Sequence, residues 1–265
     1  AHAFNGTFDG NGYIIDNLTI NTSTAGGLFG CVKNGTIQNV NLNNVSVTAS
    51  GTSGGLVGWA YESTIKNCSV TNCTVKCNGG YFAGGFVGEE CASTIQNCYV
   101  NANVTHGNGG HADDSSGVFV GNINGGSISN CVASGSVHGD DRVGGFVGNS
   151  SQNAGNLGDC VIRNCYSTAT DITGTKTGGF IGYALFHVDI ANCQAVGTPF
   201  SGYTQTDSTV SVSSGTSSTT SNPVIGNHTA NTSGATAMAD VGGTVQAIPN
   251  TGAGDDYVCN IKALF

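Results

Sequence analysis

Charged residues are scarce in this sequence. Only 9% of its 265 residues are Asp, Glu, Lys or Arg, against roughly 25% in ordinary soluble domains. Seven Lys and Arg residues stand against sixteen Asp and Glu residues, which gives a formal charge of −9. This shortage of positive charge argues against nucleic acid and anionic membrane surfaces as partners.

Long apolar runs and helical periodicity are missing as well. No apolar run approaches the ~18 residues of a spanning helix, so no membrane insertion is expected. No signal peptide is recognised, and a secreted protein would therefore be shown here in its mature form or as a fragment. The chain has 3 Pro but 43 Gly, and 38% of its residues are hydrophobic. This composition indicates many short strands joined by tight turns.

A five-residue glycine unit recurs through most of the chain. Its copies read G-G-L-F-G, G-G-L-V-G, G-G-F-V-G, G-V-F-V-G, G-G-F-V-G and G-G-F-I-G, at 26–30, 54–58, 84–88, 117–121, 144–148 and 178–182. An Ile-x-Asn unit accompanies them. Its Ile and Asn pairs are Ile15/Asn17, Ile37/Asn39, Ile65/Asn67, Ile95/Asn97, Ile128/Asn130, Ile162/Asn164 and Ile190/Asn192. A period of about 30 residues is typical of a solenoid.

The repeat predicts an all-β fold, a right-handed parallel β-helix of about seven coils with a C-terminal β-strand extension. A single coil cannot bury its apolar side, so coils stack ~4.8 Å apart and align equivalent residues in ladders. We expect an inward Ile ladder and an Asn ladder in a turn. A second buried ladder is expected at the residue after each Asn, which is Leu18, Val40, Cys68, Cys98, Cys131, Cys165 and Cys193.

The pattern G-G-[LF]-[VFI]-G followed by T-I-x-N resembles the GLUG motif of bacterial surface adhesins, haemagglutinin-like proteins and some surface-anchored peptidases. The segment F-N-G-T-F-D-G-N-G-Y-I-I-D-N-L at 4–18 is similar to the segment that begins such arrays. The resemblance covers about residues 4–196 and implies an extracellular spacer or binding surface. In the peptidases the catalytic domain is separate. No His-Glu-x-x-His sequence occurs here, so no catalytic residue is assigned and no enzyme activity is expected.

The eleven cysteines divide into two groups. The five on the predicted ladder alternate with Val and Leu, so we expect buried free thiols there. Disulfide bonds are more readily expected among the others, with Cys73–Cys77 as a local bridge. These others are Cys31, Cys73, Cys77, Cys91, Cys160 and Cys259.

Two kinds of surface site are candidates. Among eleven N-x-[ST] sequons, the predicted turn positions Asn34, Asn103 and Asn149 are the best glycosylation acceptors, although so Asn-rich a chain produces sequons by composition alone. A second candidate lies in H-A-D-D and H-G-D-D, which precede equivalent glycine units. Stacking would bring Asp113 and Asp114 beside Asp140 and Asp141.

Such carboxylates repel one another unless a cation or Arg142 intervenes. They therefore form either a Ca²⁺ site, the one cofactor considered, or a solvated acidic loop. Glu89 and Glu90 are predicted to be solvated in a turn.

Three regions are predicted: a solenoid at 1–200, a Ser/Thr-rich linker or loop at 201–235 that allows one strand at Val210 and Val212, and capping or assembly strands at 236–265. The final segment is apolar. Its candidate assembly residues are Tyr257, Val258, Ile261, Leu264 and Phe265. Because solenoid ends are bare strand edges, head-to-tail self-association into a filament is the favoured interpretation.

Function is thus predicted to be that of an extracellular structural or adhesive surface protein, with glycans or a host surface as further partners. A carbohydrate-binding or polysaccharide-degrading β-helix is the alternative, and it requires an aromatic or carboxylate-lined groove. An ice-binding solenoid is the second alternative. It requires a flat Thr face, and the row Thr36, Thr64 and Thr94 is broken by Ser127, Val161 and Asp189.

Overall fold

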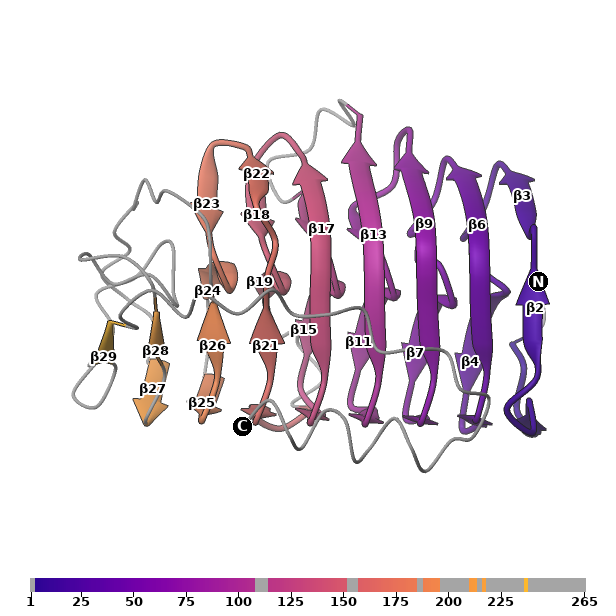
Figure 1. Ribbon diagram of the computed structural model, residues 1–265, viewed down its shortest axis with the longest axis horizontal. Helices are drawn as coiled ribbons and strands as arrows, with labels where there is room; N and C mark the ends of the chain where they lie inside the picture. Colours follow the sequence, from indigo (N-terminus) through magenta and orange to yellow (C-terminus); the bar gives the residue numbers. More distant parts are fainter. Residues whose placement is uncertain are drawn as a thin grey trace.

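The computed structural model is an all-β solenoid in which four parallel sheets run along the long axis (Figure 1). It describes residues 3–107, 114–151, 157–184 and 188–195, together with the backbone of strands at 210–213, 216–217 and 236–237. No helix in these described segments is long and apolar enough to cross a membrane. The predicted stack of parallel strands is confirmed.

Each coil passes through the four sheets in the order I, II, III and IV. Sheet I contains β1 (Thr7–Asp9), β5 (Thr36–Gln38), β8 (Thr64–Lys66), β12 (Thr94–Gln96), β16 (Ser127–Ser129), β20 (Cys160–Arg163), β25 (Val188–Ala191) and β27 (Val210–Ser213). Sheet II contains β2 (Ile14–Asp16), β3 (Thr19–Thr22), β6 (Asn41–Ala49), β9 (Ser69–Cys77), β13 (Tyr99–His106), β17 (Val132–His138), β21 (Tyr166–Ser167), β22 (Asp171–Thr173), β26 (Gln194–Ala195), β28 (Thr216–Ser217) and β29 (Thr236–Ala237).

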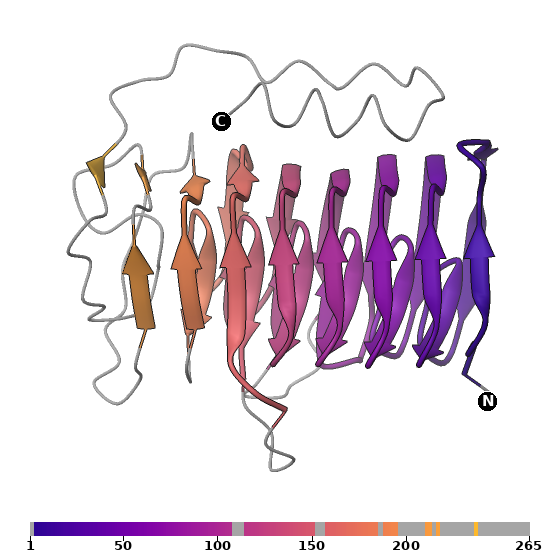
Figure 2. The same cartoon turned by 90° about the horizontal axis from the view of Figure 1, so that it is seen from below.

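The other two sheets are shorter. Sheet III contains β10 (Phe82–Gly84), β14 (Ser115–Gly117), β18 (Arg142–Gly144) and β23 (Lys176–Gly178). Sheet IV contains β4 (Phe29–Lys33), β7 (Val57–Tyr61), β11 (Val87–Cys91), β15 (Val120–Asn124), β19 (Val147–Ser150) and β24 (Ile181–Ala184). Figure 2 shows the strands of successive coils side by side along the axis.

The described part makes about six turns, because sheet IV has six strands. The sequence predicted about seven, and beyond the sixth coil the structure describes only β25 in sheet I, β26 in sheet II and the short strands β27 to β29. Ile15 pairs with Leu42 in sheet II, and Phe8 pairs with Ile37 in sheet I. The assignment of Ile15, Asn17 and Leu18 to the first rung of the three ladders was therefore wrong. Phe8 is in register with the Ile ladder instead, and β1 to β4 form the first coil of the stack.

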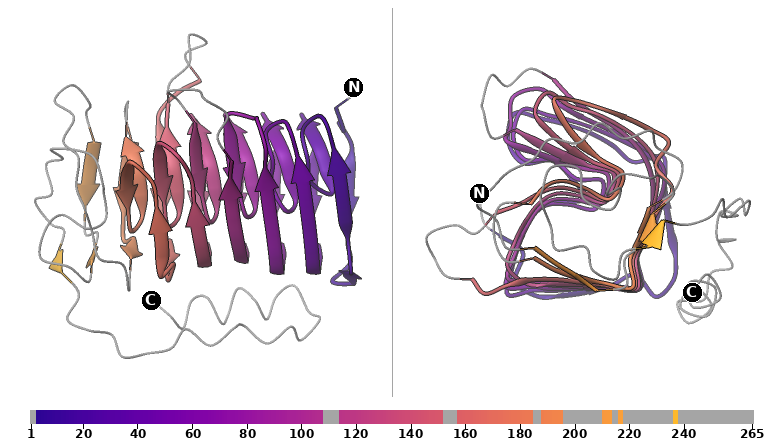
Figure 3. Two further views of the ribbon diagram at one scale, coloured as in Figure 1. Left: turned by 90° about the horizontal axis from the view of Figure 1, so that it is seen from above. Right: turned by 90° about the vertical axis from the view of Figure 1, so that its left-hand side faces the viewer.

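Sheets III and IV turn back on one another at the glycine unit, so the cross-section is indented on one side (Figure 3, right). The turn leaves no room for a side chain: a Cβ on Gly144 would lie 1.8 Å from the carbonyl oxygen of Val147. Across the indentation, the guanidinium of Arg142 in sheet III lies 4.4 Å from the ring centroid of Tyr183 in sheet IV. The tight turn at the glycine unit therefore brings the outer faces of sheets III and IV into contact.

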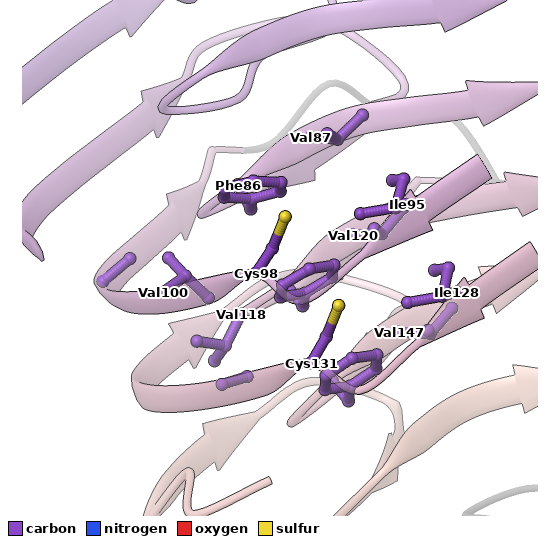
Figure 4. Packing of buried hydrophobic residues seen from close by; sticks show 14 of the residues in the cluster. Phe86, Val87, Ile95, Cys98, Val100, Val118, Val120, Ile128, Cys131 and Val147 are labelled. Carbon is purple, nitrogen blue, oxygen red and sulfur yellow. The ribbon is translucent and has the colours of Figure 1, made fainter. Parts of the chain in front are cut away.

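Three apolar ladders fill the coils (Figure 4). The six Ile residues from Ile37 to Ile190 align in sheet I and are fully buried. The Cys ladder from Cys68 to Cys193 is buried as predicted, with Val40 beside it. A third ladder comes from the glycine unit itself, where the rings of Phe86, Phe119, Phe146 and Phe180 stack at centroid distances of 4.8, 4.6 and 4.8 Å.

The Asn ladder is also confirmed and caps the turn between sheets I and II. Each amide donates to the Asn one coil earlier, at 3.2 Å from Asn97 to Asn67 and 3.2 Å from Asn130 to Asn97. Asp9 accepts from Asn39 at 3.0 Å and ends the row. All six backbones are left-handed, with φ near 56° at Asn97. Asn tolerates this conformation better than other L residues, and its amide supplies both a donor and an acceptor.

Candidate functional site

One residue of the acidic cluster predicted from the sequence, Asp141, is paired with basic side chains. Both carboxylate oxygens of Asp141 accept from Lys176 Nζ at 2.7 Å, and Arg142 Nε lies 3.5 Å from Asp141. Asp140 is exposed and Asp114 is buried. Lys176 occupies the register position next to Arg142 in sheet III. Its ammonium therefore balances the negative charge of Asp141.

No group of three or more His, Cys, Asp and Glu side chains that could hold a metal occurs in the described segments. Asp113 lies outside them. The Ca²⁺ site therefore stays a prediction.

The three glycosylation candidates lie in different environments. Asn34 is exposed in the turn after β4, as predicted. Asn103 is exposed but lies within β13, where it accepts from the Ser136 hydroxyl at 2.9 Å. Asn149 is only 1% exposed within β19 and donates to Asn122 at 2.9 Å. The assignment of Asn103 and Asn149 to turns was wrong, and Asn149 is too buried to accept a sugar in the folded chain.

The ten cysteines within the described residues are free thiols. Cys73 and Cys77, proposed as a local bridge, both point into the core from β9 and are 2% and 0% exposed. The prediction of a Cys73–Cys77 disulfide was therefore wrong. Two residues four apart on one strand face the same way, but their side chains lie too far apart to form a disulfide. Cys259 and the candidate assembly residues, from Tyr257 to Phe265, lie outside the described residues.

The threonine row proposed for ice binding is in register. Thr7, Thr36, Thr64 and Thr94 align in sheet I. The neighbouring outward row of the same sheet carries Asp9, Gln38, Lys66 and Gln96. A face that alternates Thr with charged and amide side chains lacks the flat regularity that this alternative requires.

Glu90 was predicted to be solvated and is instead buried in the core. It lies in β11, is 0% exposed, and occupies the inward row between Ala60 and Ile123. Its Oε1 accepts from the Ser93 N–H, and its Oε2 has no hydrogen-bond partner. Burial raises the pKa of Glu90 well above its usual value, and the charge of Glu89 raises it further. Burial therefore favours the protonated form of this side chain in the folded chain.

Replacing Glu90 with Gln should raise the free energy of unfolding at pH 7 by about 1–3 kcal/mol, because no buried carboxyl then has to stay protonated. The carboxyl is neutral in both states at low pH, so the gain should be small near pH 4 and grow as the unfolded-state carboxyl ionises. Urea unfolding at both pH values measures it. Glu89→Gln, on the outer face, should change stability less, and an equal gain for both variants would contradict this account.

The N-terminal end of the solenoid exposes its apolar layer. Seven side chains pack against the core but stay partly exposed, namely Phe4, Phe8, Ile15, Leu18, Ile20, Leu28 and Phe29. The residues one coil further in are covered, with Ile37, Val47 and Leu56 at 0% exposure. Among the described strands, β1, β2 and β3 also present an open edge here, whereas Phe4 pairs with part of the edge of β4. We call this surface the N-terminal end face.

A second surface feature lies on the outer face of sheet IV. Trp59 is 41% exposed on β7, and its ring centroid lies 6.2 Å from that of Tyr61. Lys33 on β4 places its ammonium 4.9 Å from the Tyr61 ring centroid. The sequence pattern did not predict this cluster of Lys33, Trp59 and Tyr61. Val57, Trp59 and Tyr61 alternate in the chain, yet Val57 is buried and Trp59 exposed, because the strand bends at Gly58, which the sheet register skips.

Residues 49–76 match the family model described as the GLUG motif. The chain carries a GLUG motif. The matched segment runs from the end of β6 through the unit 54–58 to β9, which is one complete coil. Since the other coils repeat its glycine unit and its Asn turn, the chain is a GLUG-repeat β-solenoid. A comparison with curated proteins finds no match.

Proposed function

We propose that this GLUG-repeat solenoid is an extracellular structural and adhesive surface protein that assembles head to tail into filaments. The observation that supports the proposal is the N-terminal end face, where open strand edges and partly exposed apolar side chains lie together. Open edges are templates for further strands, and a coil layer without a neighbour lacks half of its packing.

The geometry favours an end-to-end contact over a side-to-side one. Phe8, Ile15 and Ile20 face the coil interior, in line with Ile37, Leu42 and Val47 of the next coil. A second copy of the chain, docked by its C-terminal end, would continue the same ladders. Such a contact joins two different surfaces and does not close, so it propagates into a filament. This role requires no catalytic residues.

Electron microscopy of the purified chain tests the proposal. We expect long polymers whose axial repeat is close to the length of one subunit. The variant Phe8→Lys/Ile20→Lys places two charges on the end face and should leave monomers, because a charge cannot be buried unpaired at the junction. Trp59→Ala, on the side of the solenoid, is the matched control and should polymerise normally.

Uniform wild-type monomers at high concentration would overturn the filament, as would unchanged polymers of the double variant. Circular dichroism checks that the variant is folded. If the first coil unravels, Ile14→Lys alters an outward side chain of the same edge that is already 49% exposed. This milder variant should still shorten the polymers.

A further inference from the structure

The outer face of sheet IV is open over only part of its length. Trp59 is 41% exposed, whereas Asn122, Asn149 and Tyr183, further along the same register row, are 1%, 1% and 6% exposed. Arg142 covers the Tyr183 ring, and Ser151 donates to Asn122 at 3.0 Å. Arg142 of sheet III and Ser151 therefore cover the C-terminal half of this face and leave a window over β4, β7 and β11.

Within this window, aromatic rings alternate with polar groups. One row reads Cys31, Trp59 and Glu89, and the next reads Lys33, Tyr61 and Cys91. The described residues expose few large apolar side chains, and Trp59 is one of four at or above 41% exposure. Its indole N–H donates to Cys91 Sγ at 3.4 Å, which fixes the ring while leaving part of it open to a ligand.

Glu89 supplies a hydrogen-bonding group beside the rings. Its Oε1 accepts from Asn122 at 3.4 Å and from Cys91 Sγ at 3.5 Å. On the other side, the Lys33 ammonium over Tyr61 supplies donors. Aromatic faces flanked by a carboxylate and an ammonium suit a ligand with apolar C–H faces and ring hydroxyl groups, which is the chemistry of a sugar.

We propose that this window binds a neutral polysaccharide, with one sugar stacked on Trp59 and a neighbouring sugar at Tyr61, and with Glu89 and Lys33 bonding to hydroxyl groups. Trp59 and Tyr61 lie on the same strand, β7, with ring centroids 6.2 Å apart, so the glycan runs along this strand and across the solenoid axis. The formal charge of −9 opposes a polyanionic chain. The inference rests on the adhesive part of the proposed function and names its ligand class.

The chain has one tryptophan, Trp59, so its fluorescence reports on this window alone. Cellohexaose, xylohexaose and mannohexaose are the probes, and polygalacturonate is the anionic comparison. At least one neutral hexaose should shift the Trp59 emission. Calorimetry with that sugar should show roughly tenfold weaker binding by Trp59→Ala, the loss expected for one aromatic stacking contact. Tyr13→Ala changes an exposed tyrosine in the turn between β1 of sheet I and β2 of sheet II, and this variant should bind as the wild type does.

Three results would overturn the inference: no emission change with any neutral sugar, binding of polygalacturonate alone, or undiminished binding by Trp59→Ala. The end-face variant Phe8→Lys/Ile20→Lys separates the two proposals. If it is monomeric and still binds the sugar, both stand. Filaments without sugar binding would remove only the glycan site, and sugar binding by a wild-type chain that never polymerises would remove only the filament.

Discussion

Phe119→Ala is expected to lower the free energy of unfolding by about 3–5 kcal/mol, the largest effect of a single substitution in this solenoid. Phe119 is fully buried, and its ring stacks between those of Phe86 and Phe146 at 4.8 and 4.6 Å. Removing it leaves a cavity in the middle of the stack. Because each coil contacts only its two neighbours, that cavity weakens both interfaces of one coil.

Phe119→Leu is the matched control for this substitution. Leucine occupies the equivalent position in the earlier units, as Leu28 and Leu56, and Leu56 is fully buried there. The leucine variant should cost only about 1 kcal/mol. Urea unfolding followed by circular dichroism measures both variants. Equal losses for alanine and leucine would contradict the cavity explanation, because leucine fills most of the space that alanine leaves empty.

Asn97→Ala is expected to lower the free energy of unfolding by about 3–4 kcal/mol. Two causes add. The substitution removes the amide bonds to Asn67 and from Asn130, both 3.2 Å long, which are worth about 1 kcal/mol each. It also forces alanine into a left-handed backbone with φ of 56°, at about 1–2 kcal/mol.

Asn97→Gly separates these two causes. Glycine loses the same amide bonds but adopts positive φ without strain, so it should be about 1–2 kcal/mol more stable than the alanine variant. Thermal and urea unfolding of both variants checks the order. A glycine variant no more stable than the alanine variant would contradict the backbone explanation of the Asn ladder.

The ladders could be predicted from the sequence because stacking in a solenoid turns sequence spacing directly into spatial alignment. Ile65, Asn67 and Cys68 illustrate this: one repeat unit fixes an inward position, a turn and a second inward position. The first coil could not be predicted in this way. Ile15 precedes an Asn at the expected spacing, but the strand register pairs it with Leu42, and spacing alone does not distinguish the two alignments.

The surface groups were less predictable for two physical reasons. The bend at Gly58 shifts the alternation of sheet IV, so Trp59 faces outward and Glu90 inward, against a simple period of two. Which side chain pairs with Asp141 depends on how the loops, which differ in length between coils, place the strands of sheet III. Lys176 lies 35 residues further along the chain, and only the assembled register of sheet III places the two together.

Cryo-electron microscopy of the assembled chain resolves the junction between subunits and therefore tests head-to-tail assembly. We expect the ~4.8 Å strand spacing to continue across the junction, with Phe8, Ile15 and Ile20 covered by the last coil of the next subunit. Subunits joined through the sides of the solenoid, or a chain that stays monomeric with its N-terminal end face open to solvent, would contradict it.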